Sequence, residues 1–170
     1  MAAEILILRL IHILGGIFWL GGGIFAAFFL IPAIAGTPAM PQVMQGLQQR
    51  KLFIVTPIVG VLTVLTGIRL LWIDSVGFDD SYMATGPGRT FSIGGTAALI
   101  ALLLQVFVSR PAGAKLGELA AKMATNPPPE ERQRLAAEIE KLRKRNGVAT
   151  LGAVSLGLVA ASAMAIARYV

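Results

Sequence analysis

The stretch Leu10–Ile34, LIHILGGIFWLGGGIFAAFFLIPAI, decides the fold class of this chain. It has no charged residue and contains the one histidine of the sequence, His12. A helix rises about 1.5 Å per residue, so a helix of this length crosses a hydrocarbon core of about 30 Å. A soluble core does not need an apolar helix this long, and the stretch therefore predicts a membrane-spanning helix.

Small residues recur in this helix at helical spacing. Counting by threes and fours places five residues on one face: His12, Gly16, Trp19, Gly23 and Ala27. In lipid, helices associate by close approach of their backbones, which glycine and alanine permit. We therefore expect this face to meet partner helices and the bulky faces to meet lipid or another subunit.

The composition extends this interpretation to the whole chain. Of its 170 residues, 55% are hydrophobic and 14% are charged, and the mean hydropathy is +0.73. Spans are predicted at about residues 8–34, 52–73, 90–110 and 146–168, each near the 17–25 residues or so that a crossing needs. The predicted fold is all-α: a four-helix transmembrane bundle that forms a single membrane domain over residues 1–170.

Cysteine is absent from the sequence, which excludes disulfides, thioether-attached haem, iron–sulfur clusters and thiolate metal sites. Ala33-Ile34-Ala35 resembles a signal-peptide cleavage site. The segment before it carries Glu4, however, and its apolar run exceeds the usual length of about 7–15 residues. We therefore expect the first helix to be retained.

The net charge of +6 is explained by membrane topology. Basic residues gather between spans one and two and between spans three and four: Arg50, Lys51, Arg110, Lys115, Lys122, Arg132, Arg134, Lys141, Arg143, Lys144 and Arg145. The positive-inside rule places both connections in the cytoplasm and both termini on the periplasmic side of a bacterial inner membrane. The basic residues are expected to meet anionic lipid headgroups, and nucleic acid is not an expected partner.

Residues 111–145 predict a cytoplasmic helical hairpin between the third and fourth helices. Apolar residues at helical period lie on both sides of the break Asn126-Pro127-Pro128-Pro129. Pro129 followed by Glu130 and Glu131 is typical of a helix start. The alternative is a flexible basic linker.

The other spans also carry small residues at packing spacing: Gly60 and Gly67 in the second, Gly94 in the third, and Ala153, Gly157, Ala161 and Ala165 in the fourth. The last stripe could serve the internal bundle or a neighbouring protein. Gln105 is the one amide side chain in the third span, and we expect it to hydrogen-bond a neighbouring helix, a contact worth about 1 kcal/mol.

Reactive side chains are scarce in the predicted spans. Acid–base chemistry inside a membrane needs ionisable groups at depth, and spans one, three and four have none near their middle. The serines and threonines have no base positioned to activate them. We assign no catalytic residue and do not expect an enzyme.

His12 is the remaining candidate ligand. Its ring could bind haem b, copper or the magnesium of a chlorophyll-type pigment, or it could hydrogen-bond a carbonyl or hydroxyl across the bundle. Met83 and Met164 lie near the same side of the membrane, and a second copy of His12 could meet the first in a homodimer.

Several residues of the first half resemble a known family pattern: His12, Trp19, Gly21-Gly22, Pro32, Arg50-Lys51, Leu65-Thr66-Gly67 and Gly88-Arg89. Over roughly the first 110 residues the chain resembles the copper-resistance-D-like (CopD) superfamily, which includes copper-uptake proteins and the haem-linked, HemJ-type protoporphyrinogen oxidases. The resemblance implies a bundle of four or more helices with His12 as a ligand position. The HemJ-type lysine early in the third span is missing, since Phe91 to Ala98 is uncharged.

Two hypotheses follow from the sequence. The first is a non-catalytic integral membrane subunit that packs against other membrane proteins in a larger bacterial complex of the respiratory or photosynthetic type, with bound lipids. The alternative is a haem- or copper-binding CopD-like protein that uses His12.

Overall fold

The computed structural model describes residues 2–170, and this part of the chain is helical without strands. Four helical runs are long and apolar enough to cross a membrane: Ala2–Ile34, Leu52–Asp74, Gly86–Ala124 and Pro129–Tyr169. This confirms the predicted all-α class with four candidate spans. The third run ends at Ala124 rather than near residue 110, and the fourth begins at Pro129 rather than near residue 146. Both runs are longer than the predicted spans because helix continues into the polar segments on either side of Asn126.

The runs divide into the following elements: α1 (Ala2–Phe25), the π-helical turn η1 (Ala26–Leu30), α2 (Ile31–Ile34), α3 (Met40–Gln49), α4 (Leu52–Asp74), α5 (Asp80–Met83), α6 (Gly86–Leu104), the π-helical turn η2 (Gln105–Ser109), α7 (Arg110–Ala124), α8 (Pro129–Ile166) and the 3₁₀ turn η3 (Ala167–Tyr169).

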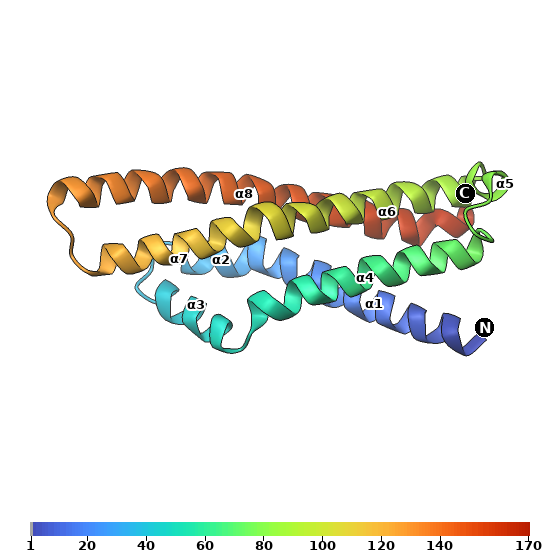
Figure 1. The fold of residues 1–170 in the computed structure, drawn as a ribbon, viewed down its shortest axis with the longest axis horizontal. Coiled ribbons are helices and arrows are strands. Elements are labelled where there is room, and N and C mark those ends of the chain that lie inside the picture. The colour runs from blue at the N-terminus through green and yellow to red at the C-terminus, as the bar shows by residue number, and fades with distance from the viewer. Residues whose placement is uncertain (1) are drawn as a thin grey trace.

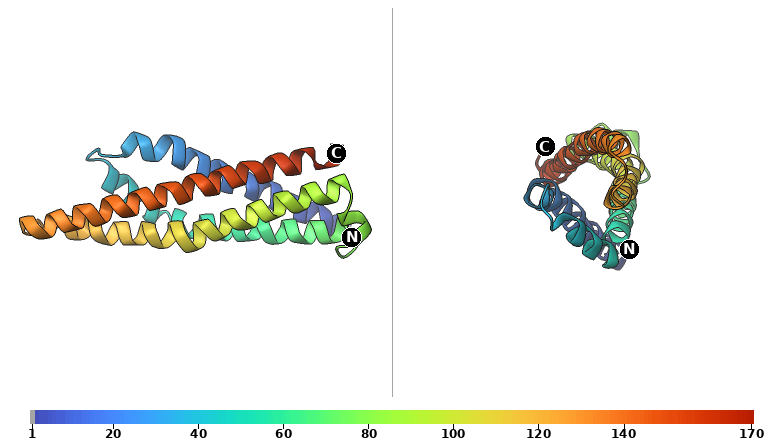
Figure 2. Two further views of the ribbon diagram at one scale, coloured as in Figure 1. Left: turned by 90° about the horizontal axis from the view of Figure 1, so that it is seen from above. Right: turned by 90° about the vertical axis from the view of Figure 1, so that its left-hand side faces the viewer.

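The long helices pack mainly as two antiparallel pairs. α1 lies along α4, and α6 lies along α8, while lesser contacts of α4 with α6 and of α1 with α8 join the pairs (Figures 1 and 2). Both chain ends and α5 lie at one end of the molecule, the terminal end (Figure 1). The turn between α7 and α8 lies at the opposite end, the hairpin end, where Leu119 and Leu135 are 2% and 8% exposed.

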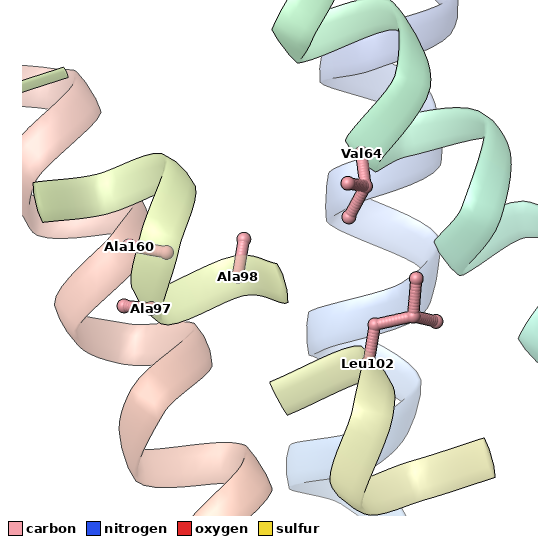
Figure 3. Close-up of a cluster of buried hydrophobic side chains, with 5 residues drawn as sticks. All are labelled: Val64, Ala97, Ala98, Leu102 and Ala160. Atoms are coloured by element: carbon pink, nitrogen blue, oxygen red, sulfur yellow. The ribbon is translucent and has the colours of Figure 1, made fainter. Parts of the chain in front are cut away.

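The core between the helices is thin and made largely of small side chains. Its main cluster comprises Val64 of α4, Ala97, Ala98 and Leu102 of α6, and Ala160 of α8 (Figure 3). Trp19 packs against this cluster. Alanine lets the helix backbones approach closely, as it does in membrane-spanning helix bundles. Most large apolar side chains face outward, and α1 has no fully buried residue.

Both π-helical turns have the same local cause. Each lies just before a proline, Pro32 or Pro111, which has no N–H to donate and whose ring clashes with the carbonyl four residues earlier. The chain avoids the clash by an extra residue in the turn, so that the N–H of Ile31 donates to the Ala26 carbonyl and that of Arg110 to the Gln105 carbonyl.

The two helix pairs share a sequence pattern around these turns. Gly15-Gly16, Phe28 and Pro32 in the first pair have counterparts in the second, namely Gly94-Gly95, Phe107 and Pro111, each 79 positions later (94 − 15, 107 − 28, 111 − 32). Glycines, phenylalanine and proline at one constant offset, together with the same π-helical turn, indicate that the first helical run of each pair repeats one sequence pattern.

Asp79 caps the short helix α5 at the terminal end. Its carboxylate accepts hydrogen bonds from the Ser81 hydroxyl and from the backbone N–H groups of Ser81 (3.0 Å) and Tyr82 (3.3 Å). These bonds, that of the hydroxyl most strongly, hold the pKa of Asp79 below its ordinary value of 3.8.

The cap should therefore contribute stability above pH 3.8 and lose it as the pH falls through the lowered pKa of the folded state. We expect hydrogen exchange at the Ser81 and Tyr82 amides, corrected for intrinsic rates, to accelerate in this acidic range. In Asp79→Ala the exchange should already be fast at neutral pH, and equal protection in both proteins would contradict the capping role.

Candidate functional site

The ring of His12 lies where three helices meet. Its Nδ1 is 2.8 Å from the backbone carbonyl oxygen of Thr63 in α4, and its Nε2 is 3.3 Å from the Sδ atom of Met164 in α8. A carbonyl oxygen only accepts, so Nδ1 carries the proton and donates it. In the neutral imidazole this tautomer leaves the lone pair of Nε2 facing the thioether.

Gly67 makes room for this arrangement. In a helix the carbonyl of residue i points toward residue i+4, so a side chain at Gly67 would cover the Thr63 carbonyl. A Cβ atom at Gly67 would lie 2.7 Å from Cε1 and 3.1 Å from Nδ1 of His12. The Thr66 hydroxyl lies 3.0 Å from the Thr63 carbonyl oxygen, but its shorter hydrogen bond, of 2.7 Å, is donated to the Leu62 carbonyl. The predicted packing residue Gly67 thus contacts the predicted ligand His12.

A second polar contact lies deeper in the bundle. The indole Nε1 of Trp19 donates to Oε1 of Gln105 at 2.5 Å, which confirms that Gln105 bonds a neighbouring helix. The indole lies on Gly60, where a Cβ atom would be 3.0 Å from Cε2 of Trp19 and 3.1 Å from Cδ1 of Leu102. Gln105 is the first residue of η2, so the π-helical turn and this hydrogen bond coincide.

We expect Trp19 and Gln105 to be energetically coupled. Trp19→Phe leaves the Gln105 oxygen without its donor, and Gln105→Leu leaves the indole N–H without its acceptor, so the double substitution should cost less than the sum of the two. A double-mutant cycle on the free energy of unfolding in mixed micelles should give a coupling of about 0.6–1.7 kcal/mol. Strict additivity would contradict the contact.

The predicted packing glycines lie between helices. A Cβ atom would come within 3.8 Å of Thr63 at Gly16, 3.7 Å of Val154 at Gly23 and 2.7 Å of Leu20 at Gly157. At Gly94 it would come within 3.1 Å of the Ala163 Cβ and 3.2 Å of the Ala160 carbonyl oxygen. These distances place the glycine face of α1 against α4 and α8, and Gly94 at the contact of α6 with α8.

The stripe predicted on the fourth span packs only in part. Ala153 is half-buried and Ala161 is exposed, whereas the buried residues of this helix and of η3 are Leu135, Val154, Ala160, Ala163 and Ala167. A helix has about 3.6 residues per turn, so a strict four-residue spacing drifts about 40° around the axis at each step. Within this chain, Ala161 therefore does not lie on the packed face.

The sequence did not predict the ion pair of Glu4 with Arg69, which links α1 to α4 at the terminal end of the molecule. The Nη2 atom of Arg69 lies 2.6 Å from Oε1 of Glu4, and the guanidinium stacks 4.5 Å from the centre of the Trp72 ring. Glu4 and Arg69 are far apart in the sequence, so no spacing could indicate the pair. The pair is half-exposed, and its contribution to stability is accordingly small.

The donor set at His12 is one imidazole nitrogen and one thioether sulfur. A haem iron between them would need both atoms in line, about 4.3 Å apart if bonds of about 2.0 Å to nitrogen and 2.3 Å to sulfur are taken. The observed 3.3 Å is too short for this, and a pigment bound to Nε2 alone would have to displace Met164. Haem and chlorophyll therefore do not fit His12 in this arrangement.

These two donors fit part of a trigonal or tetrahedral coordination shell, in which a metal ion also takes at least one further ligand. With the same bond lengths, the 3.3 Å separation corresponds to a nitrogen–metal–sulfur angle of about 100°. Imidazole and thioether together suit copper(I), a soft ion. Residues 2–170 contain no group of three or more histidine, cysteine or acidic side chains that could hold a metal ion.

The fold and the site together define a small multi-helix protein with four candidate membrane spans and two partly buried polar contacts between helices. No protein-family model, curated protein or solved structure matches the chain. The resemblance to the CopD superfamily therefore remains a prediction.

Proposed function

We propose that this protein is a non-catalytic integral membrane subunit that packs into and stabilises a larger bacterial membrane complex, of the respiratory or photosynthetic type. The observation that carries the proposal is a set of open glycines within the spans. A Cβ atom at Gly21, Gly22 or Gly95 would meet no other atom within 4 Å. Glycine costs a helix about 1 kcal/mol relative to alanine, and in lipid it is used where backbones meet.

The proposed orientation follows from charge. The basic residues of the α3–α4 connection, of α7 and of the first part of α8 lie in the segments that the positive-inside rule assigns to the cytoplasm. In this proposal the four spans form one bundle, residues 111–145 form a cytoplasmic helical hairpin, and both termini are periplasmic in the inner membrane.

Purification from native membranes tests the proposal. We expect stoichiometric partner proteins to copurify with the wild-type chain in mild detergent. Gly22→Leu should lower their recovery while the thermal unfolding midpoint of the isolated chain stays unchanged, because the added side chain meets open space within the chain. Gly46→Leu, at an equally open glycine of α3, is the matched control. A lone, monodisperse protein would overturn the proposal.

The distance between Nε2 of His12 and Sδ of Met164 favours a second candidate function, the binding of copper(I). The two side chains would hold the ion as soft ligands, while the bond from Nδ1 to the Thr63 carbonyl fixes the orientation of the ring. The resemblance to the CopD superfamily points to the same histidine.

Titration with copper(I) against a competing chelator tests this candidate. We expect His12→Ala and Met164→Leu each to weaken binding by at least about tenfold, the scale of effect seen even for residues that only support metal ligands. Met83→Leu, a methionine that also lies at the terminal end, should leave affinity unchanged. Equal affinity in Met164→Leu would exclude the pair as the site, and a Soret band lost in His12→Ala would replace copper with haem.

A further inference from the structure

An open pocket of about 280 Å³ lies between α1 and α4 at the terminal end of the molecule (Figure 1). Its lining includes residues of both helices and of the turn after α4: Glu4, Ile5, Arg69, Trp72, Ile73 and Val76. These residues lie near the ends of two helical runs that are long and apolar enough to cross a membrane. In a membrane the pocket would therefore lie at the level of the lipid head groups, where tryptophan is enriched.

The pocket is lined by one carboxylate and one guanidinium, whose charges sum to zero. Nε and Nη2 of Arg69 both donate to Oε1 of Glu4, at 3.1 and 2.6 Å. The second carboxylate oxygen, Oε2, and the guanidinium Nη1 therefore stay outside this ion pair. The Arg69 and Glu4 side chains are 43% and 42% exposed, so a ligand can reach both. The pocket thus offers a charged donor and a charged acceptor side by side.

The indole of Trp72 holds the guanidinium in one orientation. The centre of its ring lies 4.5 Å from Cζ of Arg69, so the indole covers one face of the guanidinium. The N–H bonds of a guanidinium lie in its plane, and stacking on a ring therefore leaves its edge able to donate. A guanidinium fixed in this way loses less conformational freedom when it binds a phosphate through that edge.

Apolar surface adjoins the two charged groups. The side chain of Val76 is 87% exposed, and its backbone has a φ of 51°, a strained conformation for a β-branched residue. Valine therefore gains little here from its backbone or from burial among residues 2–170. Ile5 and Ile73 add half-buried apolar surface to the same pocket. A ligand that carries an apolar part beside its charged groups would cover this surface, which favours a lipid over a soluble zwitterion.

We propose that this pocket binds a zwitterionic phospholipid whose head group carries a primary ammonium, as in phosphatidylethanolamine. The phosphate accepts a hydrogen bond from Nη1 of Arg69, the ammonium donates to Oε2 of Glu4, and the apolar part of the lipid lies on Val76. The quaternary ammonium of phosphatidylcholine has no N–H to donate, and phosphatidylglycerol has no cation for the carboxylate. The inference rests on the membrane location in the proposed function, but on neither the partner complex nor the orientation.

The first test compares lipids on the purified full-length protein in a neutral detergent. Phosphatidylethanolamine, phosphatidylcholine and phosphatidylglycerol with the same acyl chains are titrated, and the thermal unfolding midpoint is followed. Phosphatidylethanolamine should raise the midpoint with a half-saturating concentration at least about tenfold below those of the other two, as expected for one charge-assisted hydrogen bond. Free phosphoethanolamine should not raise it over the same range. Equal action of the three lipids, or of free phosphoethanolamine, would overturn the proposal.

The second test removes the two charged groups. Glu4→Gln and Arg69→Gln should each raise the half-saturating concentration of phosphatidylethanolamine at least about tenfold, measured as the gain over the lipid-free midpoint of the same variant. Both should fold, because a half-exposed ion pair contributes little to stability. Lys115→Gln with Glu118→Gln, which removes the ion pair of α7, is the matched control and should leave the concentration unchanged. Equal weakening by the control, or no weakening by Glu4→Gln, would overturn the proposal.

The third test uses the exposed valine. Val76→Gly relieves the strain of the positive φ and should leave the lipid-free midpoint unchanged or raise it. The same variant should gain less from phosphatidylethanolamine than the wild type, because the apolar contact is lost. A full gain in Val76→Gly would contradict the placement of the lipid. None of these results depends on whether partner proteins copurify, so this proposal and that of the membrane subunit can fail separately.

Discussion

Gly94→Leu should force α6 away from α8 and lower the free energy of unfolding by about 1–3 kcal/mol, the usual cost of overpacking. A Cβ atom at this position lies 3.1 Å from the Cβ of Ala163 and 3.2 Å from the carbonyl oxygen of Ala160. Neither atom belongs to a flexible side chain, so the strain can be relieved only by moving a helix. Because α6 and α8 form one of the two main helix pairs, the whole bundle should loosen.

The adjacent glycine supplies the control. Gly95→Leu makes the same chemical change one residue along the same helix, where a Cβ atom has no neighbour within 4 Å. We expect it to be neutral or stabilising, since leucine is the better helix former by somewhat less than about 1 kcal/mol. Unfolding of both variants in mixed micelles measures the difference, and equal destabilisation would contradict the packing of α6 on α8.

Gly67→Ala should displace the His12 ring and break its bond to the Thr63 carbonyl. The added Cβ atom would lie 2.7 Å from Cε1 of His12, and the ring cannot turn away without giving up the 2.8 Å bond from Nδ1. We expect a loss of about 1–3 kcal/mol in the free energy of unfolding, from strain together with the unpaired ring nitrogen.

A double substitution isolates the cause. In a His12→Ala background the clash disappears, and Gly67→Ala should then be neutral or stabilising, because alanine is favoured over glycine in a helix by about 1 kcal/mol. The measurement is the free energy of unfolding of the four proteins of the cycle. If Gly67→Ala costs the same with and without His12, the contact between them does not determine the stability of this region.

Comparison with the internal repeat shows which residues of the candidate site are not part of the repeated pattern. At the constant offset of 79 positions, His12 corresponds to Phe91 and Gln105 to Ala26, so neither polar residue is a feature of the repeated unit. Both polar contacts also join the first helix pair to the second: His12 with Met164, and Trp19 with Gln105. His12 and Gln105, which differ from their counterparts in the repeat, are therefore residues that hold the two helix pairs together, and His12 with Met164 is the site proposed for copper(I).

Parts of this site could be predicted from the sequence. One histidine in an apolar helix is a conspicuous signal, and both a carbonyl bond across the bundle and Met164 as a neighbour were among the alternatives. The π-helical turns were not predicted. The sequence nevertheless held a usable signal, because Phe-x-x-x-Pro follows Gly-Gly at the same distance in two of the spans. Nothing in the sequence indicated the ion pair of Glu4 with Arg69.

The sequence by itself determined the class of the elements and the number of candidate spans. Apolar length decides whether a helix can cross a membrane, and that property is local to each segment. Only the tertiary structure decided which small residues pack. A Cβ atom at Gly94 would meet α8, whereas one at Gly95 would meet open space, although the two are neighbours of the same type. Their roles depend on the rotation and crossing of helices, which are set by contacts between residues distant in the chain.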